Sequence, residues 1–372
     1  MNRLKAVTEL GQAIWLDYIR RDILENGHLA ALVEDDGVSG VTSNPAIFQK
    51  AIGESDLYDA DIRAELAAEP DIGVQELYER IAVRDIQLAA DVLRPVFDRT
   101  EGADGFVSLE VSPRLARDTE GTLAEARRLW RRVDRPNLMI KVPATAEGLP
   151  AIEDLLAEGI HVNITLMFSM SHYENVAQAY LRGTARNADP SRVASVASFF
   201  VSRVDSLIDR KLGEIGTEAA LDLRGRIGIA NSKLAYRRYQ ELFEGAAFAE
   251  WADRGGRPQR VLWASTSTKN PDYRDVLYVE ELIGPDTVNT VPPATVEAFR
   301  DHGVAEPRLL DDIDGAAEQV ARLSELGIDL GEATERLQEE GLAKFVDPFD
   351  RLLATLGAKR DALSGELATS GG

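Results

Sequence analysis

The sequence predicts a single (β/α)8 barrel with additional helices, and three observations lead to this fold class. Short apolar runs alternate with longer amphipathic stretches, a pattern typical of βαβ units that build a parallel sheet. Eight such apolar runs can be counted, and eight parallel strands close into a barrel. The length of 372 residues fits barrels with insertions, which run from about 200 to over 400 residues. An open doubly wound sheet is the alternative, but the glycine fingerprint of a dinucleotide-binding fold is missing.

The expected elements follow one another along the chain. The strands are Ala13–Ile19, Gly40–Asn44, Gly105–Ser112, Asn137–Pro143, His161–Phe168, Ala194–Arg203, Arg260–Thr266 and Thr287–Pro293. Apolar residues at helical spacing predict helices in Val74–Phe97, Arg114–Trp130, Gly148–Leu156, His172–Leu181, Val204–Phe243 and Asp275–Leu282. An inserted helix and loop is expected at Glu54–Ile72, and several helices from Ala294 to Leu363, of which Leu330–Leu363 should pack on the barrel wall. We therefore expect one domain, residues 1–367, and a flexible tail, residues 368–372.

The composition limits the classes of function. The chain has no Cys, which excludes disulfides and thiolate chemistry, and its four His residues lack metal-ligand spacing. A formal net charge of −21 argues against nucleic acid as a partner. No apolar run approaches the ~20 residues of a membrane span, and the first 25 residues lack the apolar core of a signal peptide. We expect a cytoplasmic monomer or homodimer without metal, cofactor, nucleic-acid or membrane partner.

Several expected strands become polar toward their C-terminal ends, on alternate residues. Side chains two residues apart share one face of a strand, so the polar groups of each strand point the same way. Active sites of parallel barrels lie at the C-terminal mouth and take residues from several strands. These sets are Ser108, Glu110 and Ser112; Asn137, Met139 and Lys141; Asn163 and Thr165; and Ser198, Phe200 and Ser202.

Lys141 is the first candidate for chemistry, because the chain has eight Lys against 34 Arg and this Lys lies within an apolar strand. A Lys at a strand end can simply extend its amine to solvent. The catalytic interpretation is that burial disfavours the charged amine, and a neutral amine can attack a carbonyl to form a Schiff base. The residues alone leave both interpretations open.

Two carboxylates and two cations complete the candidates. Glu110 lies in the third strand and Asp17 in the first, and each is either part of a structural ion pair or a general acid/base. Arg203 ends the sixth strand and Lys269 follows the seventh, late in the strand order, where barrels commonly hold phosphate. The rigid donor fork of Arg suits phosphate, although a solvated surface charge is the other explanation for each cation.

Five motifs, in order along the chain, resemble those of the transaldolase family. They are Val41-Thr-Ser-Asn-Pro-Ala, Ser108-Leu-Glu-Val-Ser, Ile140-Lys-Val-Pro-Ala-Thr, Gly159-Ile-His-Val-Asn-Ile-Thr-Leu-Met-Phe-Ser and Ser198-Phe-Phe-Val-Ser-Arg, on the second to sixth strands. With Asp17 before them and Ser265 after them, the resemblance covers well over half of the chain. The length and the Trp15-Leu-Asp-Tyr start are similar to the longer bacterial subgroup.

The resemblance implies a cofactor-free enzyme of the pentose phosphate pathway. It would transfer a dihydroxyacetone unit from sedoheptulose 7-phosphate to glyceraldehyde 3-phosphate, giving erythrose 4-phosphate and fructose 6-phosphate. Lys141 would form the Schiff base, Asp17 would act as acid/base at the cleaved bond, and Glu110 and Thr165 would hold a catalytic water. The implied substrate-binding residues are Asn44, Asn163 and Ser198 for hydroxyl groups, Arg203 and Ser265 for phosphate, and Thr42 and Phe200 beside them.

The chain departs from the family pattern after the seventh strand. Many relatives have Gly-Ala-Ser-Phe-Arg-Asn on the seventh strand, whereas this chain has Trp263-Ala-Ser-Thr-Ser-Thr-Lys-Asn, so we expect Lys269 to take the charge role of the Arg. On the sixth strand, Ser198-Phe-Phe replaces the common Ser-Pro-Phe. Three other functions remain open: a fructose 6-phosphate aldolase, an inactive sugar-phosphate-binding barrel, and an enzyme acting on sulfonated sugars. Such aldolases tend to carry Gln in place of Glu110 and Tyr in place of Phe200, so both positions favour transfer.

Overall fold

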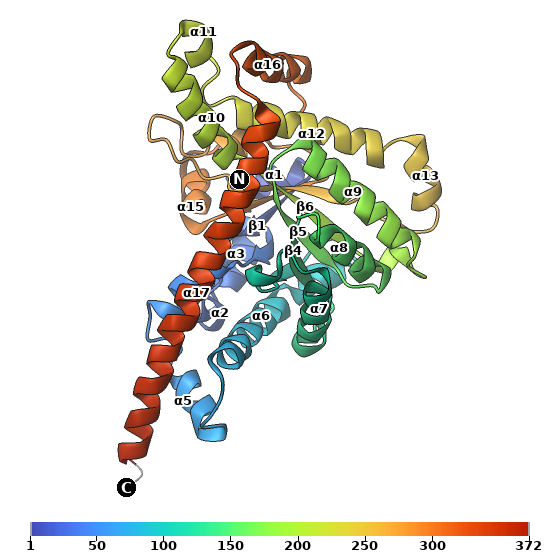
Figure 1. The fold of residues 1–372 in the computed structure, drawn as a ribbon. Helices are drawn as coiled ribbons and strands as arrows, with labels where there is room; N and C mark the ends of the chain where they lie inside the picture. The colour runs from blue at the N-terminus through green and yellow to red at the C-terminus, as the bar shows by residue number, and fades with distance from the viewer. Residues whose placement is uncertain (1, 371–372) are drawn as a thin grey trace.

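A computed structural model describes residues 2–370, and its centre is a closed barrel of eight parallel strands (Figure 1). Each strand pairs with the next along the chain, and β8 pairs with β1 to close the barrel. The strands are β1 Gln12–Leu16, β2 Val38–Thr42, β3 Phe106–Glu110, β4 Leu138–Pro143, β5 Val162–Met167, β6 Ser195–Phe200, β7 Arg260–Ala264 and β8 Thr287–Val291. The predicted fold class and all eight predicted strands are confirmed.

Every predicted strand except the fourth, which ends at Pro143 as predicted, extends too far at its C-terminal end, because the chain leaves the ladder earlier than its apolar pattern suggests. The expected end of the second strand, Asn44, is the N-cap of the next helix and accepts a hydrogen bond from the Ile47 N–H. The expected end of the sixth, Arg203, already lies in the following helix. Residues expected at strand ends therefore lie on the turns and helix starts above the barrel.

Helices cover the outside of the barrel and lie in the segments that connect its strands. Their bounds are α1 Arg3–Glu9, α2 Arg21–Glu25, α3 His28–Asp36, α4 Pro45–Phe48, α5 Asp59–Ala68, α6 Val74–Arg99, α7 Thr119–Val133, α8 Gly148–Ala157, α9 Met170–Ala185, α10 Ser202–Ile215, α11 Glu218–Leu221, α12 Ile227–Phe243, α13 Ala246–Ala252, α14 Leu277–Glu281, α15 Pro293–His302, α16 Ile313–Glu325 and α17 Leu330–Ser370. Short π or 3-10 segments are η1 Gln49–Gly53, η2 Pro113–Leu115 and η3 Pro190–Arg192. Residues 2–370 contain no helix that is long and apolar enough to cross a membrane.

Two predicted helices differ from the structure. The stretch Val204–Phe243 is divided into α10, α11 and α12, because Gly216 ends α10 in the left-handed conformation at φ +69°. The stretch Arg114–Trp130 begins as a 3-10 turn, and α7 starts only after Asp118, whose carboxylate caps the Gly121 N–H. In both places, apolar residues at helical spacing continue past a residue at which a helix ends or begins.

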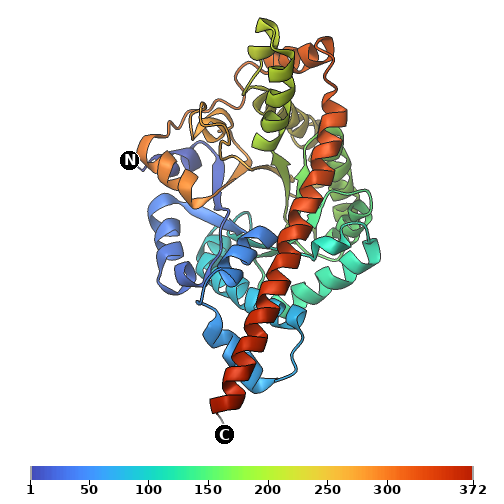
Figure 2. The same cartoon turned by 60° about the vertical axis from the view of Figure 1, so that its left-hand side comes forward.

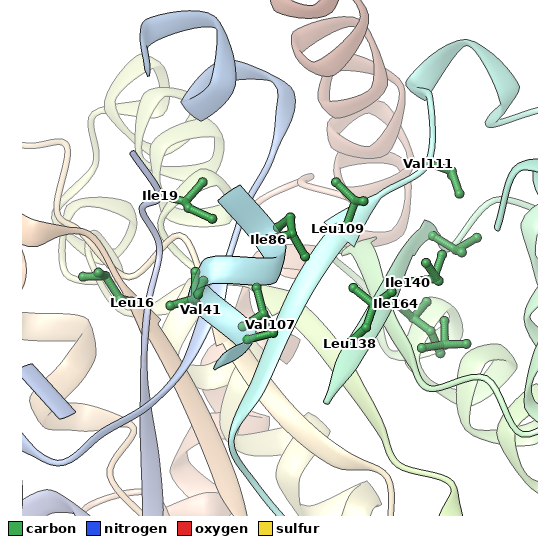
Figure 3. Close-up of a cluster of buried hydrophobic side chains, with 14 of the residues drawn as sticks. Leu16, Ile19, Val41, Ile86, Val107, Leu109, Val111, Leu138, Ile140 and Ile164 are labelled. Carbon is green, nitrogen blue, oxygen red and sulfur yellow. The ribbon is translucent and has the colours of Figure 1, made fainter. Parts of the chain in front are cut away.

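Outward-facing strand residues form the main core between the sheet and its helices. Ile86 of α6 lies close to Val41 and Val107 of the strands, with Leu109 and Ile140 further along the same layer (Figure 3). Each of these side chains is almost completely buried. Burying an aliphatic side chain of this size contributes about 1.5–3 kcal/mol to folding.

A second apolar cluster lies inside the barrel and continues above it. It includes Trp15, Phe106 and Met139, which fill the lower interior, and it extends to Phe200 of β6 and Phe345 of α17. A Cβ atom on Gly40 would lie 2.4 Å from the Trp15 ring, so only glycine leaves room for this indole. The interior is therefore closed below the mouth, and any site must lie above this layer.

The long C-terminal helix α17 packs on the outside of the barrel against α6 over its second half, as predicted, but its first half crosses the mouth. Gln338 Nε2 donates hydrogen bonds to the carbonyl oxygens of Ala144 and Leu166, 3.1 and 3.0 Å away, at the ends of β4 and β5. Both views show α17 as one long rod that continues beyond the barrel, with α5 beside its last turns (Figure 1, Figure 2). Amphipathicity revealed that one face of this helix is buried, but not which surface it covers.

The end of the chain extends this helix. α17 is helical as far as Ser370, and residues 371 and 372 lie outside the described residues. The flexible tail expected at residues 368–372 therefore stays a prediction, although its first three residues are helical.

Candidate active site

A cavity of about 250 Å³ opens at the C-terminal mouth of the barrel. Ten of the twelve predicted site residues line it, namely Asp17, Thr42, Asn44, Lys141, Thr165, Ser198, Phe200, Arg203, Ser265 and Lys269. The other two, Glu110 and Asn163, lie behind its wall and contact residues that line it. The structure thus brings together side chains that are up to 252 positions apart, from Asp17 to Lys269.

Lys141 occupies the centre of the site, on the inward face of β4. Its Nζ donates a hydrogen bond to the Ser43 carbonyl oxygen at 3.2 Å and lies 3.8 Å from Glu110 Oε2. The Phe345 ring of α17 faces the same amine, with 5.8 Å between Nζ and the ring centroid. Only 7% of the Lys141 side chain is exposed, which rules out a solvated surface amine.

Glu110 adjoins Lys141 on β3 and is in an unusual state for a carboxylate. Burial raises the pKa of Glu110 to about 7, although the Lys141 charge acts in the opposite direction. Among the described residues, neither carboxylate oxygen has a hydrogen-bond partner, and the same holds for the Thr165 hydroxyl on β5. Buried polar atoms normally have partners, so these atoms are available to a water or substrate group. Near pH 7, Glu110 can both donate and accept a proton.

Asp17 lies just after β1, on the other side of the cavity. Burial raises the pKa of its carboxyl group, while the charge of Lys141 and a hydrogen bond from Thr42 lower it. Thr42 Oγ1 donates to Asp17 Oδ1 at 2.8 Å and lies 2.7 Å from Thr290 Oγ1. Because Thr42 gives its single proton to Asp17, Thr290 is the donor in the second bond. This chain of hydroxyl groups fixes the carboxylate.

Asn163 lies behind the cavity wall instead of in it. Its Nδ2 donates to Ser108 Oγ at 3.0 Å, and its Oδ1 accepts from Ser198 Oγ at 2.7 Å. The side chain is fully buried, so Ser198 is the member of this chain that reaches the cavity. Asn44 does line the cavity, but its side-chain oxygen caps α4, which leaves its amide N–H groups for a ligand.

A basic subsite closes the far side of the cavity. Burial lowers the pKa of the Arg203 guanidinium, which lies over the Phe200 ring with Cζ 5.2 Å from its centroid. Its Nη1 is buried and has no hydrogen-bond partner in the part of the chain that the structure describes. Lys269 donates to Ser267 Oγ at 2.7 Å, and its pKa is lowered by burial and then by the Arg203 charge. The Asp17 carboxylate raises the pKa of both cations, but neither forms an ion pair within residues 2–370, and two such cations facing one cavity favour an anionic ligand.

Backbone geometry adds to the basic subsite. Ser265 adopts the left-handed conformation, φ +58°, which is uncommon for a residue with a side chain. Its carbonyl oxygen accepts the Ser202 N–H at 3.1 Å, and the two hydroxyl oxygens lie 3.0 Å apart. The strained turn therefore joins the end of β7 to the N-terminus of α10, whose dipole also favours an anion.

Four further groups at the site escaped the sequence-based prediction. They are the Ser43 carbonyl, Ser267, Thr290 and Phe345. Thr290 could have been found, because it alternates with Val288 on the inward face of β8. A backbone carbonyl and a residue of a distant helix leave no such pattern.

Comparison with known proteins identifies the family. A family profile described as Transaldolase/Fructose-6-phosphate aldolase matches residues 14–356. The chain belongs to this family. A transaldolase of Thiobacillus denitrificans is 51% identical, with 96% of this chain and 100% of the relative covered. A transaldolase of Thermobifida fusca is 50% identical, with coverages of 94% and 96%, and transaldolase 2 of Nostoc punctiforme is 47% identical, with coverages of 98% and 99%.

Membership of the transaldolase/fructose-6-phosphate aldolase family confirms the resemblance that rested on five motifs. These motifs place Lys141, Glu110 and Thr165 on three adjacent strands, where the register pairs Glu110 with Lys141 and Lys141 with Asn163. Each motif therefore contributes to one continuous surface at the barrel mouth. Lys269, in the segment that departs from the family pattern, lines the cavity near Arg203.

Proposed function

We propose that the chain is a transaldolase that acts through a Schiff base on Lys141. It would transfer dihydroxyacetone from sedoheptulose 7-phosphate to glyceraldehyde 3-phosphate, giving erythrose 4-phosphate and fructose 6-phosphate. The observation that carries the proposal is the enclosed Lys141 amine, between the carboxylates Glu110 and Asp17, in a cavity whose far side is basic. Relatives of about 50% identity that are named transaldolase support the same activity.

The first step is attack of the Lys141 amine on the ketose carbonyl. The N–C bond forms, and the carbonyl oxygen leaves as water after it has taken protons. Glu110 is suited to deliver and recover these protons through a water that also bonds to Thr165, because both groups have buried polar atoms without protein partners. The product is an iminium, which can accept an electron pair.

The second step breaks the bond between carbons 3 and 4 of the ketose. Asp17 takes the proton of the carbon-4 hydroxyl group, the aldehyde leaves, and the bonding electrons move into the iminium to give an enamine. A second aldehyde then enters, the new carbon–carbon bond forms, and Asp17 returns its proton to the new hydroxyl group. A carboxyl whose pKa is raised by burial is a stronger base in this role than an exposed Asp.

The basic subsite provides the other half of substrate recognition. Arg203, Lys269 and Ser265 lie across the cavity from Lys141. They would bind the phosphate that both donor sugars, sedoheptulose 7-phosphate and fructose 6-phosphate, carry. Thr42, Asn44 and Ser198 also line the cavity and would bind hydroxyl groups of the three-carbon fragment, with Asn163 orienting Ser198. Fixing both ends of the sugar places its carbonyl against the amine. All the residues assigned to this site come from one chain, and we propose a monomer or a homodimer.

A product analysis separates transfer from simple aldol release. With fructose 6-phosphate and erythrose 4-phosphate together, we expect sedoheptulose 7-phosphate as the main product and little free dihydroxyacetone. Free dihydroxyacetone that accumulates at the same rate without an acceptor would identify an aldolase instead. Replacing the phosphate by a sulfonate on the donor tests the anion specificity in the same assay.

A further inference from the structure

A second, smaller cavity lies outside the barrel wall, beside Glu110. Its volume is about 20 Å³, which is sufficient for one ordered water. It lies between the end of β3 and the helices α6 and α7, and Phe349 of α17 contributes to its lining. Polar residues in this lining include Glu110, Tyr78 and Glu125.

This cavity adjoins the active site. Asn44 lines both cavities, and Glu110 lines the small one while its Oε2 lies 3.8 Å from Lys141 Nζ in the large one. Both carboxylate oxygens of Glu110 are buried, and no residue in the described part of the chain forms a hydrogen bond with them. Glu110 therefore separates the two cavities and can exchange a proton or a water with either.

The other end of the small cavity leads toward solvent. Gln75 is exposed there, and Glu125 is half-buried, with its Oε1 accepting the Ser112 N–H at 2.8 Å. Between these residues and Glu110 lies Tyr78, whose ring is held edge-on by Phe48 and Phe349, at centroid distances of 5.8 and 5.6 Å.

The electrostatics agree with this placement of Tyr78. Burial raises the pKa of Tyr78, and the negative charges of Glu110, Glu125 and Glu79 raise it further. The hydroxyl group is therefore a permanent hydrogen-bond donor at neutral pH, located between an inner and an outer carboxylate. A water in the cavity could bond to the hydroxyl and to Glu110 at the same time.

The proposed Schiff-base chemistry requires a route by which water can reach and leave Lys141. Imine formation joins the Lys141 nitrogen to the ketose carbon, breaks the carbon–oxygen bond and releases one water, and hydrolysis of the product imine takes one water back. Meanwhile the sugar fills the mouth, and α17 covers it with Phe345 against the amine. Water must then enter and leave past a bound substrate or by another path.

We propose that the small cavity is this other path, a separate passage for the water of imine formation and hydrolysis, with Tyr78 as the positioning residue that holds the water next to Glu110. The inference rests on the proposed Schiff-base mechanism. It assigns no role to Tyr78 in cleavage of the carbon–carbon bond, because that step neither releases nor consumes water. Loss of the hydroxyl group should therefore slow some steps and leave others unchanged.

The test compares Tyr78→Phe with wild type by rapid quenching in borohydride, which reduces and fixes every imine. After mixing with fructose 6-phosphate, the sum of six-carbon and three-carbon adducts reports imine formation. We expect this rate to fall about tenfold, because one hydrogen bond to a buried water is worth about 1 kcal/mol or slightly more. After the three-carbon adduct has formed, added erythrose 4-phosphate should convert it to a seven-carbon adduct at the wild-type rate.

Tyr173→Phe is the matched control. Its hydroxyl group is buried and has no hydrogen-bond partner within residues 2–370, and it lies on α9 away from both cavities. This variant should match wild type in both steps. Imine formation at the wild-type rate in Tyr78→Phe would overturn the passage, and so would an equal loss in both steps, which indicates a general disturbance. Absence of any adduct in wild type would instead overturn the Schiff-base mechanism itself.

Discussion

Trp15 of β1 and Asp17 just after it are two positions apart along the chain, and so are Met139 and Lys141 of β4. The first member of each pair belongs to the apolar layer that fills the lower barrel, whereas the second faces the cavity above it. The lower layer is so tightly filled that Gly40 has no room for a Cβ atom beside Trp15. The upper layer leaves the carboxylate of Glu110 buried without hydrogen bonds.

This difference shows how one strand serves two purposes. The lower layer and the outer core stabilise the fold, while the upper layer holds polar groups in states that cost stability. We therefore expect changes in the upper layer to reduce catalysis and to leave the stability of the fold unchanged or higher. Changes in the lower layer should reduce stability and leave catalysis close to wild type.

The largest effect, apart from loss of Lys141 itself, is expected for Glu110→Gln. Removal of the proton donor should lower kcat by about 10²–10⁴-fold, which is the usual contribution of general acid/base catalysis. The pKa of about 7 also predicts that wild-type kcat falls above pH 7, where Glu110 can no longer donate, and that the variant lacks this fall. Steady-state kinetics from pH 5 to about pH 9 checks both points.

The free energy of unfolding of the same variant tests whether the buried carboxylate of Glu110 lowers stability. Burial raises the folded-state pKa of Glu110 from 4.5 to about 7, so ionisation is harder in the folded protein and stability is lost as the pH rises through this interval. Glu110→Gln should therefore be more stable than wild type at about pH 8, by a few kcal/mol at most, and gain little at about pH 4.5. An unfolded variant would show that Glu110 is instead a structural partner of Lys141.

A moderate effect is expected for Arg203→Ala. A hydrogen bond to a charged group is worth about 1.5–3 kcal/mol, so KM for fructose 6-phosphate should rise about 10–150-fold. KM for free dihydroxyacetone as donor should change little, because it carries no phosphate. Arg192→Ala is the control, since that side chain is 82% exposed on η3 and remote from the cavity. Equal losses with both donors would contradict a phosphate contact.

We expect the smallest effect on catalysis for a substitution in the lower layer, Gly40→Ala. Gly40→Ala would force a methyl group against Trp15, and overpacking of this kind costs about 1–3 kcal/mol. Chemical denaturation should show that loss, with kcat close to wild type. Gly213→Ala on α10 is the control, because a Cβ there meets no atom within 4 Å and Ala favours the helix. A drop in kcat as large as that of Glu110→Gln would abolish the distinction between the layers.

Much of this comparison could be predicted from the sequence, because a strand has a period of two. Alternation at Ser108 and Glu110, and at Asn163 and Thr165, indicated which side chains face inward and that the site lies at the C-terminal mouth. Parallel register then brings residues at equivalent strand positions together without any long-range information. The same reasoning identified Lys141, although only the structure shows how fully it is enclosed.

Other features depend on tertiary packing that no local pattern records. The approach of Phe345 to Lys141 depends on the path of α17 across the mouth, and an amphipathic helix can cover any apolar surface. The Ser43 carbonyl is a backbone group, so the sequence cannot mark it. Asn163 faces inward as predicted, but a neighbouring serine lies between it and the cavity.

The central claim is that Lys141 forms a covalent intermediate with the donor sugar. Borohydride reduction in the presence of fructose 6-phosphate, followed by peptide mass mapping, tests it directly, with Lys141→Met as the control. We expect a three-carbon adduct on Lys141 in wild type, and neither adduct nor turnover in the variant. A folded wild-type protein that turns over fructose 6-phosphate without any adduct on Lys141, or a variant that keeps wild-type activity, would contradict the mechanism.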